Sequence, residues 1–258
     1  MRPLILVTND DGITAKGIRS LVETASKMGE VVVVAPDSPQ SGQGHAITID
    51  NPLRLKKSDI FKGIDAWECT GTPVDCVKLA KHVVLKGRKI DLCVSGINHG
   101  SNASINIIYS GTMSAAMEAS MEGIHSIGFS LLDYSQEADF GPASVWAEKI
   151  MRWTLENGLP GSRLLNVNFP KLPLADIRGI RVCRQSEGRW DEAFQQGRTP
   201  AGQPYWWLTG KFICEDDGED TDHWALENGF ISIVPSMHDL TDHRALKAVS
   251  AIENQLVK

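Results

Sequence analysis

The sequence predicts an α/β fold: a Rossmann-like, doubly wound and mostly parallel sheet with a β-rich C-terminal extension. Two apolar runs, at residues 4–8 and 31–35, flank a stretch with helical apolar spacing at residues 18–28. This strand, helix, strand order predicts a right-handed βαβ unit with parallel strands. The alternation continues, with strands expected at 90–94, 127–131 and 164–169 and helices expected from residue 73, at 112–121 and at 145–155.

Length, composition and charge exclude several classes of protein. The chain has 258 residues, 42% of them apolar, so it can bury a core and lacks the bias of a disordered chain. Its net charge of −6 argues against a nucleic-acid binder, including a binder of duplexes. Apolar runs are far shorter than a membrane span, and the first residues lack a signal-peptide pattern. We therefore expect a cytoplasmic protein with small partners and no membrane contact.

The residues after position 170 differ in pattern from those before it. Strand-like segments at 178–185, 205–214 and 230–234 predict an antiparallel extension, and two short strands are expected earlier, at 46–51 and 67–70. We divide the chain into an α/β core at 1–177, a β-rich oligomerisation arm at 178–240 and a helix at 241–258. Apolar spacing predicts that this helix packs on the core through Ala245, Ala248, Val249, Ile252 and Leu256. The five widely spaced cysteines are interpreted as small buried hydrophobic residues.

Polar, glycine-rich segments follow three expected strands, at residues 9–12, 37–44 and 95–112, the last containing a long loop. Ligands of an open parallel sheet bind outside the carboxyl ends of its strands. The first segment lacks the Gly-x-Gly-x-x-Gly pattern of dinucleotide-binding folds and carries Asp10 and Asp11 instead. Because carboxylates repel phosphate, an anionic ligand here requires a cation, for which they are hard oxygen ligands. A plain turn or helix cap is the alternative interpretation.

Several motifs along the chain resemble those of one family. They are VTNDDG at 7–12, APD at 35–37 with SG at 41–42, GTPVDCV at 71–77, SGIN at 95–98 with YSGT at 109–112, LNVNFP at 165–170 and TD at 221–222. Their order and residues resemble the SurE (stationary-phase survival protein) family of metal-dependent nucleotidases over most of the chain.

The resemblance implies which residues form the site. It implies one divalent ion per subunit, Mg²⁺ or Mn²⁺, held by oxygens of Asp10, Asp11, Ser41 and Asn98. The implied substrate contacts are Asn9, Asn102, Ser110, Gly111 and Thr112. Gly111 and Thr112 open a helix whose N–H groups would face the phosphate, although an ordinary helix cap has the same donors. The expected catalytic residues are Asp10, Asp11, Asn102 and Ser110.

The resulting prediction is a 5′-nucleotidase, a phosphomonoesterase that hydrolyses nucleoside monophosphates or related esters with a metal-activated water. Adjacent aspartates do not fit the Asp-x-Asp arrangement of haloacid-dehalogenase-like phosphatases. A non-catalytic nucleotide-binding module on the same fold is the alternative, and the missing glycine fingerprint weakens a Rossmann-type transferase or oxidoreductase. The family resemblance implies a homodimer or homotetramer with a swapped arm.

The sequence leaves open the roles of two histidines and three tryptophans. His45 and His99 lie in the motif loops and are interpreted as exposed loop residues, with a general-acid role as the alternative. Trp190, Trp206 and Trp207 are interpreted as packing or interface residues, with stacking on a nucleobase as the alternative.

Overall fold

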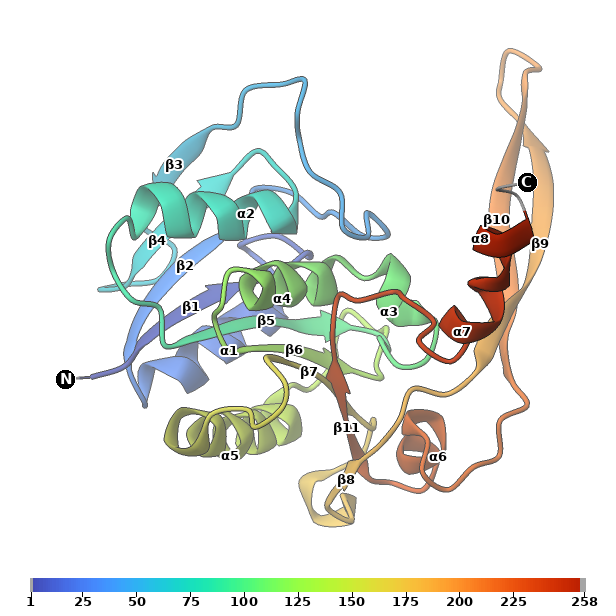
Figure 1. Ribbon diagram of the computed structural model, residues 1–258. Coiled ribbons are helices and arrows are strands. Elements are labelled where there is room, and N and C mark those ends of the chain that lie inside the picture. Colours follow the sequence, from blue (N-terminus) through green and yellow to red (C-terminus); the bar gives the residue numbers. More distant parts are fainter. Residues whose placement is uncertain (1, 256–258) are drawn as a thin grey trace.

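The computed structural model describes residues 2–255 and is built around one nine-stranded sheet with helices on both faces (Figure 1). The strands are β1 (Leu4–Thr8), β2 (Glu30–Pro36), β3 (Leu55–Ser58), β4 (Asp65–Cys69), β5 (Leu92–His99), β6 (Ser126–Leu131), β7 (Leu164–Phe169), β8 (Ile180–Val182), β9 (Gly188–Arg198), β10 (Pro204–Cys214) and β11 (Ile231–Ser236). The helices are α1 (Lys16–Ser26), α2 (Pro73–Leu79), α3 (Asn106–Tyr109), α4 (Gly111–Met121), α5 (Gly141–Asn157), α6 (Asp222–Glu227), α7 (Leu246–Val249) and α8 (Ala251–Gln255), with a π-helical turn at Ala80–Val84 and a 3-10 turn at Leu174–Asp176.

The strand order across the sheet is β3-β4-β2-β1-β5-β6-β7-β11-β8. The six strands from β4 to β7 are parallel, whereas β3 pairs antiparallel with β4 and β11 pairs antiparallel with β7. From β1 the chain adds β2 on one side, and it later adds β5, β6 and β7 on the other side. The predicted doubly wound, mostly parallel sheet is therefore confirmed, and its switch point lies between β1 and β5.

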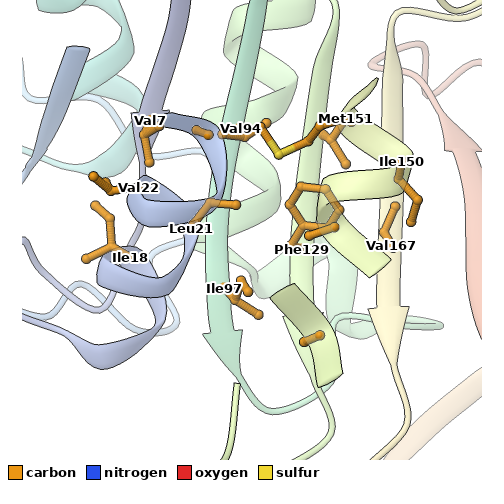
Figure 2. Packing of buried hydrophobic residues seen from close by; sticks show 14 of the residues in the cluster. Val7, Ile18, Leu21, Val22, Val94, Ile97, Phe129, Ile150, Met151 and Val167 are labelled. Carbon is orange, nitrogen blue, oxygen red and sulfur yellow. The ribbon is translucent and has the colours of Figure 1, made fainter. Parts of the chain in front are cut away.

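Each face of the sheet carries two helices. Helices α1 and α5 pack together over one face, where Leu21 and Met151 lie near the sheet residues Val94 and Phe129 (Figure 2). Helices α2 and α4 cover the other face, and Val77 of α2 shares that core with apolar residues of β1 and β2. These strands are buried on both faces, and their continuous apolar runs follow from that burial.

The crossover through α5 differs in hand from its neighbours. The unit β1-α1-β2 and the unit β6-α5-β7 place their helices on the same face, yet they step along the sheet in opposite directions. Two parallel units related in this way have opposite hands. The units β5-α4-β6 and β6-α5-β7 step in the same direction along the sheet with their helices on opposite faces, so these two units also have opposite hands. The unit through α5 differs from both of the others and therefore has the uncommon left-handed crossover.

One predicted strand, at residues 46–51, is wrong, because its polar groups are bound to helix α2 instead of to a strand. Thr48 donates from its N–H and its hydroxyl to Asp75, and the hydroxyl of Thr72 donates to the carbonyl of Ala46 over 2.7 Å. The same Thr72 and Asp75 form a capping box at the start of α2, with Pro73 at its first position as expected. The segment is thereby held as irregular chain across the end of α2.

Two strands and part of a third were not predicted from the sequence. β3 and β9 are rich in polar residues and lack the apolar runs that mark the central strands. β5 continues to His99, so the connection that follows it begins at Gly100, later than the loop expected from residue 95. That connection also contains the short helix α3.

The segment expected as an arm, residues 178–240, is divided in the structure. β8 and β11 extend the main sheet, whereas β9 and β10 form a separate antiparallel hairpin that extends away from it (Figure 1). The expected single terminal helix is two short helices, and Leu246, Val249 and Ile252 are 54%, 55% and 52% exposed. This described part therefore does not pack on the core, and Leu256 lies outside the described residues.

Side-chain burial agrees with the interpretation of four cysteines. Cys69, Cys76, Cys93 and Cys183 are buried and Cys214 is half-buried, all as free thiols. Over residues 2–255, the helices fall short of the combined length and apolarity that a membrane crossing requires.

Phe129 provides a test of the core. It is fully buried in β6 and stacks on Phe169 with ring centroids 5.8 Å apart. Phe129→Ala should lower the free energy of unfolding by about 3–5 kcal/mol in urea titrations, because the cavity adds to the lost apolar burial. Val145→Ala on the exposed side of α5 is the control and should change it by less than about 0.5 kcal/mol. A loss below about 1 kcal/mol for Phe129→Ala would contradict this description of the core.

Candidate active site at the switch point

Residues after β1 and at the end of β5 lie at the switch point of the sheet. The two strands are parallel neighbours in register, with Thr8 opposite Ser95. The turn that carries Asp10 and Asp11 leaves β1 directly after Thr8, and Asn98 lies three residues beyond Ser95. The fold therefore brings the predicted carboxylates and amide to one edge, where ligands of such sheets bind.

Asp10 and Asp11 are adjacent carboxylates in a largely buried place. Burial and the charge of Asp11 raise the pKa of Asp10 from 3.8 to about 6, although hydrogen bonds from Thr112 oppose the rise. Burial also raises the pKa of Asp11, and the proximity of His99 opposes it. Two carboxyl groups whose pKa values are both raised form a site of unbalanced negative charge. A bound cation would neutralise that charge.

Helix α4 begins against Asp10. Thr112, which is fully buried, donates from its hydroxyl to Oδ1 of Asp10, and its backbone also bonds to Asp10. A Cβ at Gly111 would lie only 2.7 Å from the Cβ of Asp10, so this position requires glycine. The contact fixes the carboxylate beside the helix N-terminus, and it directs Thr112 to Asp10 instead of to open space.

Two asparagines present oxygens at this edge. The amide nitrogen of Asn98 donates to the carbonyls of His99 and Gly100, both over 3.0 Å, so its Oδ1 stays available. The amide nitrogen of Asn9 donates to the carbonyl of Gly12 over 2.9 Å, while its buried Oδ1 has no hydrogen-bond partner. A buried oxygen without a donor on Asn9 and a free amide oxygen on half-buried Asn98, together with two carboxylates, fit a hard divalent cation or its bound water. For Asn9 this leaves an acceptor, which suits a cation or water better than a phosphate.

Asn102 and Ser110 form the opposite side of the site, and both are buried. One N–H of the Asn102 amide donates to the Ser130 hydroxyl over 2.7 Å, which leaves its second N–H free. Ser110 caps α4 by accepting from the N–H of Met113, and its own hydroxyl hydrogen remains available as a donor. Together with the N–H of Gly111, these groups offer hydrogen-bond donors to an anion at the helix N-terminus.

Ser130, Asn166 and Asn168 support this loop, a role that was not predicted from the sequence. The N–H of Asn102 donates to Asn168, the amide of Asn166 donates to the carbonyl of Asn102, and Asn168 donates to Asn166. The one signal in the sequence is two asparagines at alternate positions of a strand that is otherwise apolar, since a buried amide there needs a partner.

Ser41 lies in an exposed loop that is held close to the carboxylates. The N–H of Gln40 donates to the carbonyl of Asp10 over 2.7 Å, and the N–H of Gly44 donates to the carbonyl of Tyr109. The hydroxyl of Ser41 itself is exposed and contacts neither aspartate in this structure. The loop therefore places Ser41 at the rim of the site, on the side of Asp10.

The two loop histidines have partners within the protein. His45 approaches Glu118, a buried residue of α4, with Nε2 3.0 Å from a carboxylate oxygen, and Glu118 also binds Lys78. His99 is half-buried and packs edge-on against Phe140, with ring centroids 4.9 Å apart. The interpretation of His99 as an exposed residue is therefore wrong, because its ring packs against Phe140.

The fold and this site define a doubly wound α/β protein with an oxygen-lined, cation-compatible site that faces the N-terminus of a helix. A family model described as survival protein SurE matches residues 5–192. The chain belongs to the SurE family.

Individual relatives agree with this assignment over nearly the whole chain. A protein of Flavobacterium johnsoniae named 5′-nucleotidase SurE is 60% identical over 96% of both chains, and a protein of the same name from Cytophaga hutchinsonii is 59% identical over 95% of both. The crystal structure of the SurE protein from Aquifex aeolicus has a TM-score of 0.84 and 38% identity, covering 97% of this chain and all of that chain.

Asp10→Asn tests the electrostatic strain of the site. A carboxyl whose pKa is raised from 3.8 to about 6 on folding makes the folded state less stable as the pH rises from about 4 to 6. One pKa unit corresponds to about 1.4 kcal/mol, so with chelator at pH 7.5 the variant should gain up to about 3 kcal/mol in unfolding free energy.

The control for Asp10→Asn is the same comparison of unfolding free energies at pH 4. At pH 4 the wild-type carboxyl is largely protonated in the folded protein, so the two proteins should differ little. A variant that is less stable than the wild type at pH 7.5 in chelator would show that Asp10 is not strained.

Proposed function

We propose that this chain is a 5′-nucleotidase, a metal-dependent phosphomonoesterase that hydrolyses nucleoside monophosphates to nucleoside and phosphate. The observation that carries the proposal is the contact between Asp10 and the start of α4, which joins a cation site to an anion site. The names of the relatives, 5′-nucleotidase SurE, support the same activity. Five free cysteines suit a reducing compartment, and we place the enzyme in the cytoplasm.

Four oxygen ligands would hold one divalent ion per subunit: Asp10, Asp11, Ser41 and Asn98. The donor set is hard and contains no thiolate or imidazole, so it favours Mg²⁺ or Mn²⁺ over zinc. When bound, the ion supplies charge that offsets the phosphoryl oxygens and lowers the pKa of a water. Asn9 fits this arrangement through its unpaired Oδ1, as an acceptor for a water of the ion.

The other side of the site holds the phosphate. The second N–H of Asn102, the hydroxyl of Ser110 and the N–H of Gly111 donate to its oxygens, and the positive end of α4 adds to the attraction. Thr112 keeps Asp10 in position, so its contribution to substrate binding is indirect. Asp11 is less buried than Asp10 and is the carboxylate open to take a proton from the attacking water.

Removal and return of the metal ion test the activity. Chelation with EDTA should abolish phosphate release from a nucleoside monophosphate, and Mn²⁺ should restore it at a lower concentration than Mg²⁺ does. Far-ultraviolet circular dichroism should not change, because the sheet and its helices pack without the ion. Full activity in chelator would contradict a metal-dependent reaction, and nucleotide binding without any phosphate release would favour the non-catalytic binding module.

Substitutions of the proposed ligands test the assignment of the site. Partners behind metal ligands typically contribute about 10- to 100-fold to affinity or activity, so Asp11→Asn should lower kcat/KM at least about 100-fold. Asn98→Ala removes a neutral ligand and should lower it about 10-fold. Asn157→Ala, at an exposed amide of α5, is the control and should leave kcat/KM unchanged. Normal metal affinity and turnover in Asn98→Ala would remove Asn98 from the ligand set.

The β9–β10 hairpin is the proposed contact between subunits of a homodimer or homotetramer. It exposes Phe194, Trp206, Trp207 and Leu208 at 66%, 58%, 66% and 61%, a large apolar surface for an isolated hairpin. At micromolar concentration the protein should sediment at twice 28.2 kDa or more, and a Trp206→Ser, Trp207→Ser double variant should shift toward smaller species. A wild-type species of 28.2 kDa would contradict the assembly.

A further inference from the structure

A cavity lies beside the phosphate side of the site, between the end of α3 and the hairpin. Its volume is about 410 Å³, within the usual range of about 300–1,000 Å³ for small-molecule sites. The lining consists of Tyr109, Trp190, Glu192, Leu208, Thr209 and Gly210. Tyr109 directly precedes Ser110, so the cavity begins one residue away from the proposed phosphate site.

Trp190 is held in a fixed orientation at the edge of the cavity. Its indole N–H donates to Oδ1 of Asn106 in α3 over 2.8 Å, and its ring packs edge-on against Phe212 with centroids 5.9 Å apart. The residue is nevertheless 40% exposed. An aromatic ring that is fixed in place but still accessible can stack on a flat ligand without losing further side-chain freedom.

The hairpin register explains why a hollow forms here. Trp190 pairs with Phe212 and Glu192 pairs with Gly210, so these side chains share one face of the hairpin. Gly210 has no side chain between Leu208 and Phe212 on that face, and an added Cβ would lie 2.7 Å from the carbonyl oxygen of Asp191. The position is thus kept open by the backbone itself.

We propose that this cavity binds the nucleobase of the substrate, with Trp190 and Tyr109 as stacking residues, and that it favours purine nucleoside monophosphates. The inference rests on the proposed function, since it places the base next to a phosphate bound at Ser110. Purines offer a larger stacking area than pyrimidines do. The carboxylate of Glu192 accepts hydrogen bonds from the N–H groups at the edge of adenine or guanine.

The test compares a purine nucleoside monophosphate with ribose 5-phosphate, which has the same phosphate and sugar but no base. Trp190→Ala should lower kcat/KM for AMP about 10-fold, mainly through KM, and leave ribose 5-phosphate within about 2-fold. Trp190→Phe keeps an aromatic face and should retain most of the activity on AMP. Trp153→Ala, at a tryptophan of α5 that is 51% exposed, is the control and should change neither substrate.

Other outcomes separate a base-binding role of Trp190 from a structural one and from failure of the proposed function. Equal losses on both substrates, or a change in sedimentation that accounts for the loss, would show that Trp190 only supports the loop or the assembly. Unchanged kinetics on AMP would place the base elsewhere. If the wild type hydrolyses neither ester, the proposed function fails, and adenosine binding measured by calorimetry still decides the subsite: binding that weakens in Trp190→Ala supports it, and equal binding overturns it.

Discussion

The contact between Asp10 and the first turn of α4 is the constraint on which the rest of the site depends. Gly111 lets the helix approach the carboxylate, and the hydroxyl of Thr112 fixes its orientation. This contact holds the end of strand β1 against the start of helix α4, across the switch point. The Asp10 carboxylate and the N–H groups at the start of α4 become neighbours. A cation bound to the carboxylate and a phosphate bound to the N–H groups would therefore lie side by side and attract each other.

This arrangement lowers the stability of the folded protein and leaves polar groups free to bind a ligand. Burial of two adjacent carboxylates raises the pKa of both, and oxygens such as Oδ1 of Asn9 are left without donors. The supporting amides of Asn102, Asn166 and Asn168, by contrast, are hydrogen-bonded to one another. At this edge of the sheet, an oxygen without a donor thus lies where a ligand would complete it, and the supporting amides already have partners.

Apolar periodicity is enough to predict the central strands and the switch point, because those strands are buried on both faces. It fails for β3 and β9, whose polar residues carry no such period, and for residues 46–51, where Asp75 takes the hydrogen bonds that a strand would form. The ligand candidates come from the family resemblance, and the fold brings Asp10, Asp11 and Asn98 to one edge. The role of Asn168 could not be predicted, since it arises from a contact with residue 102 across 66 positions of chain.

The hairpin leaves the sheet and returns to it at a single closed neck. Arg184 bridges to Thr221 through the backbone, and its guanidinium binds Asp216 and Asp220 over 2.6 and 3.0 Å. The chain between Arg184 and Thr221 leaves the sheet and returns to it at the same place. A change in the length of this segment therefore leaves the register of β8 and β11 intact. The entropy of closing such a loop grows only slowly with its length. The neck therefore makes the hairpin a segment whose length can vary between relatives while the edge of the sheet that carries the candidate site stays the same.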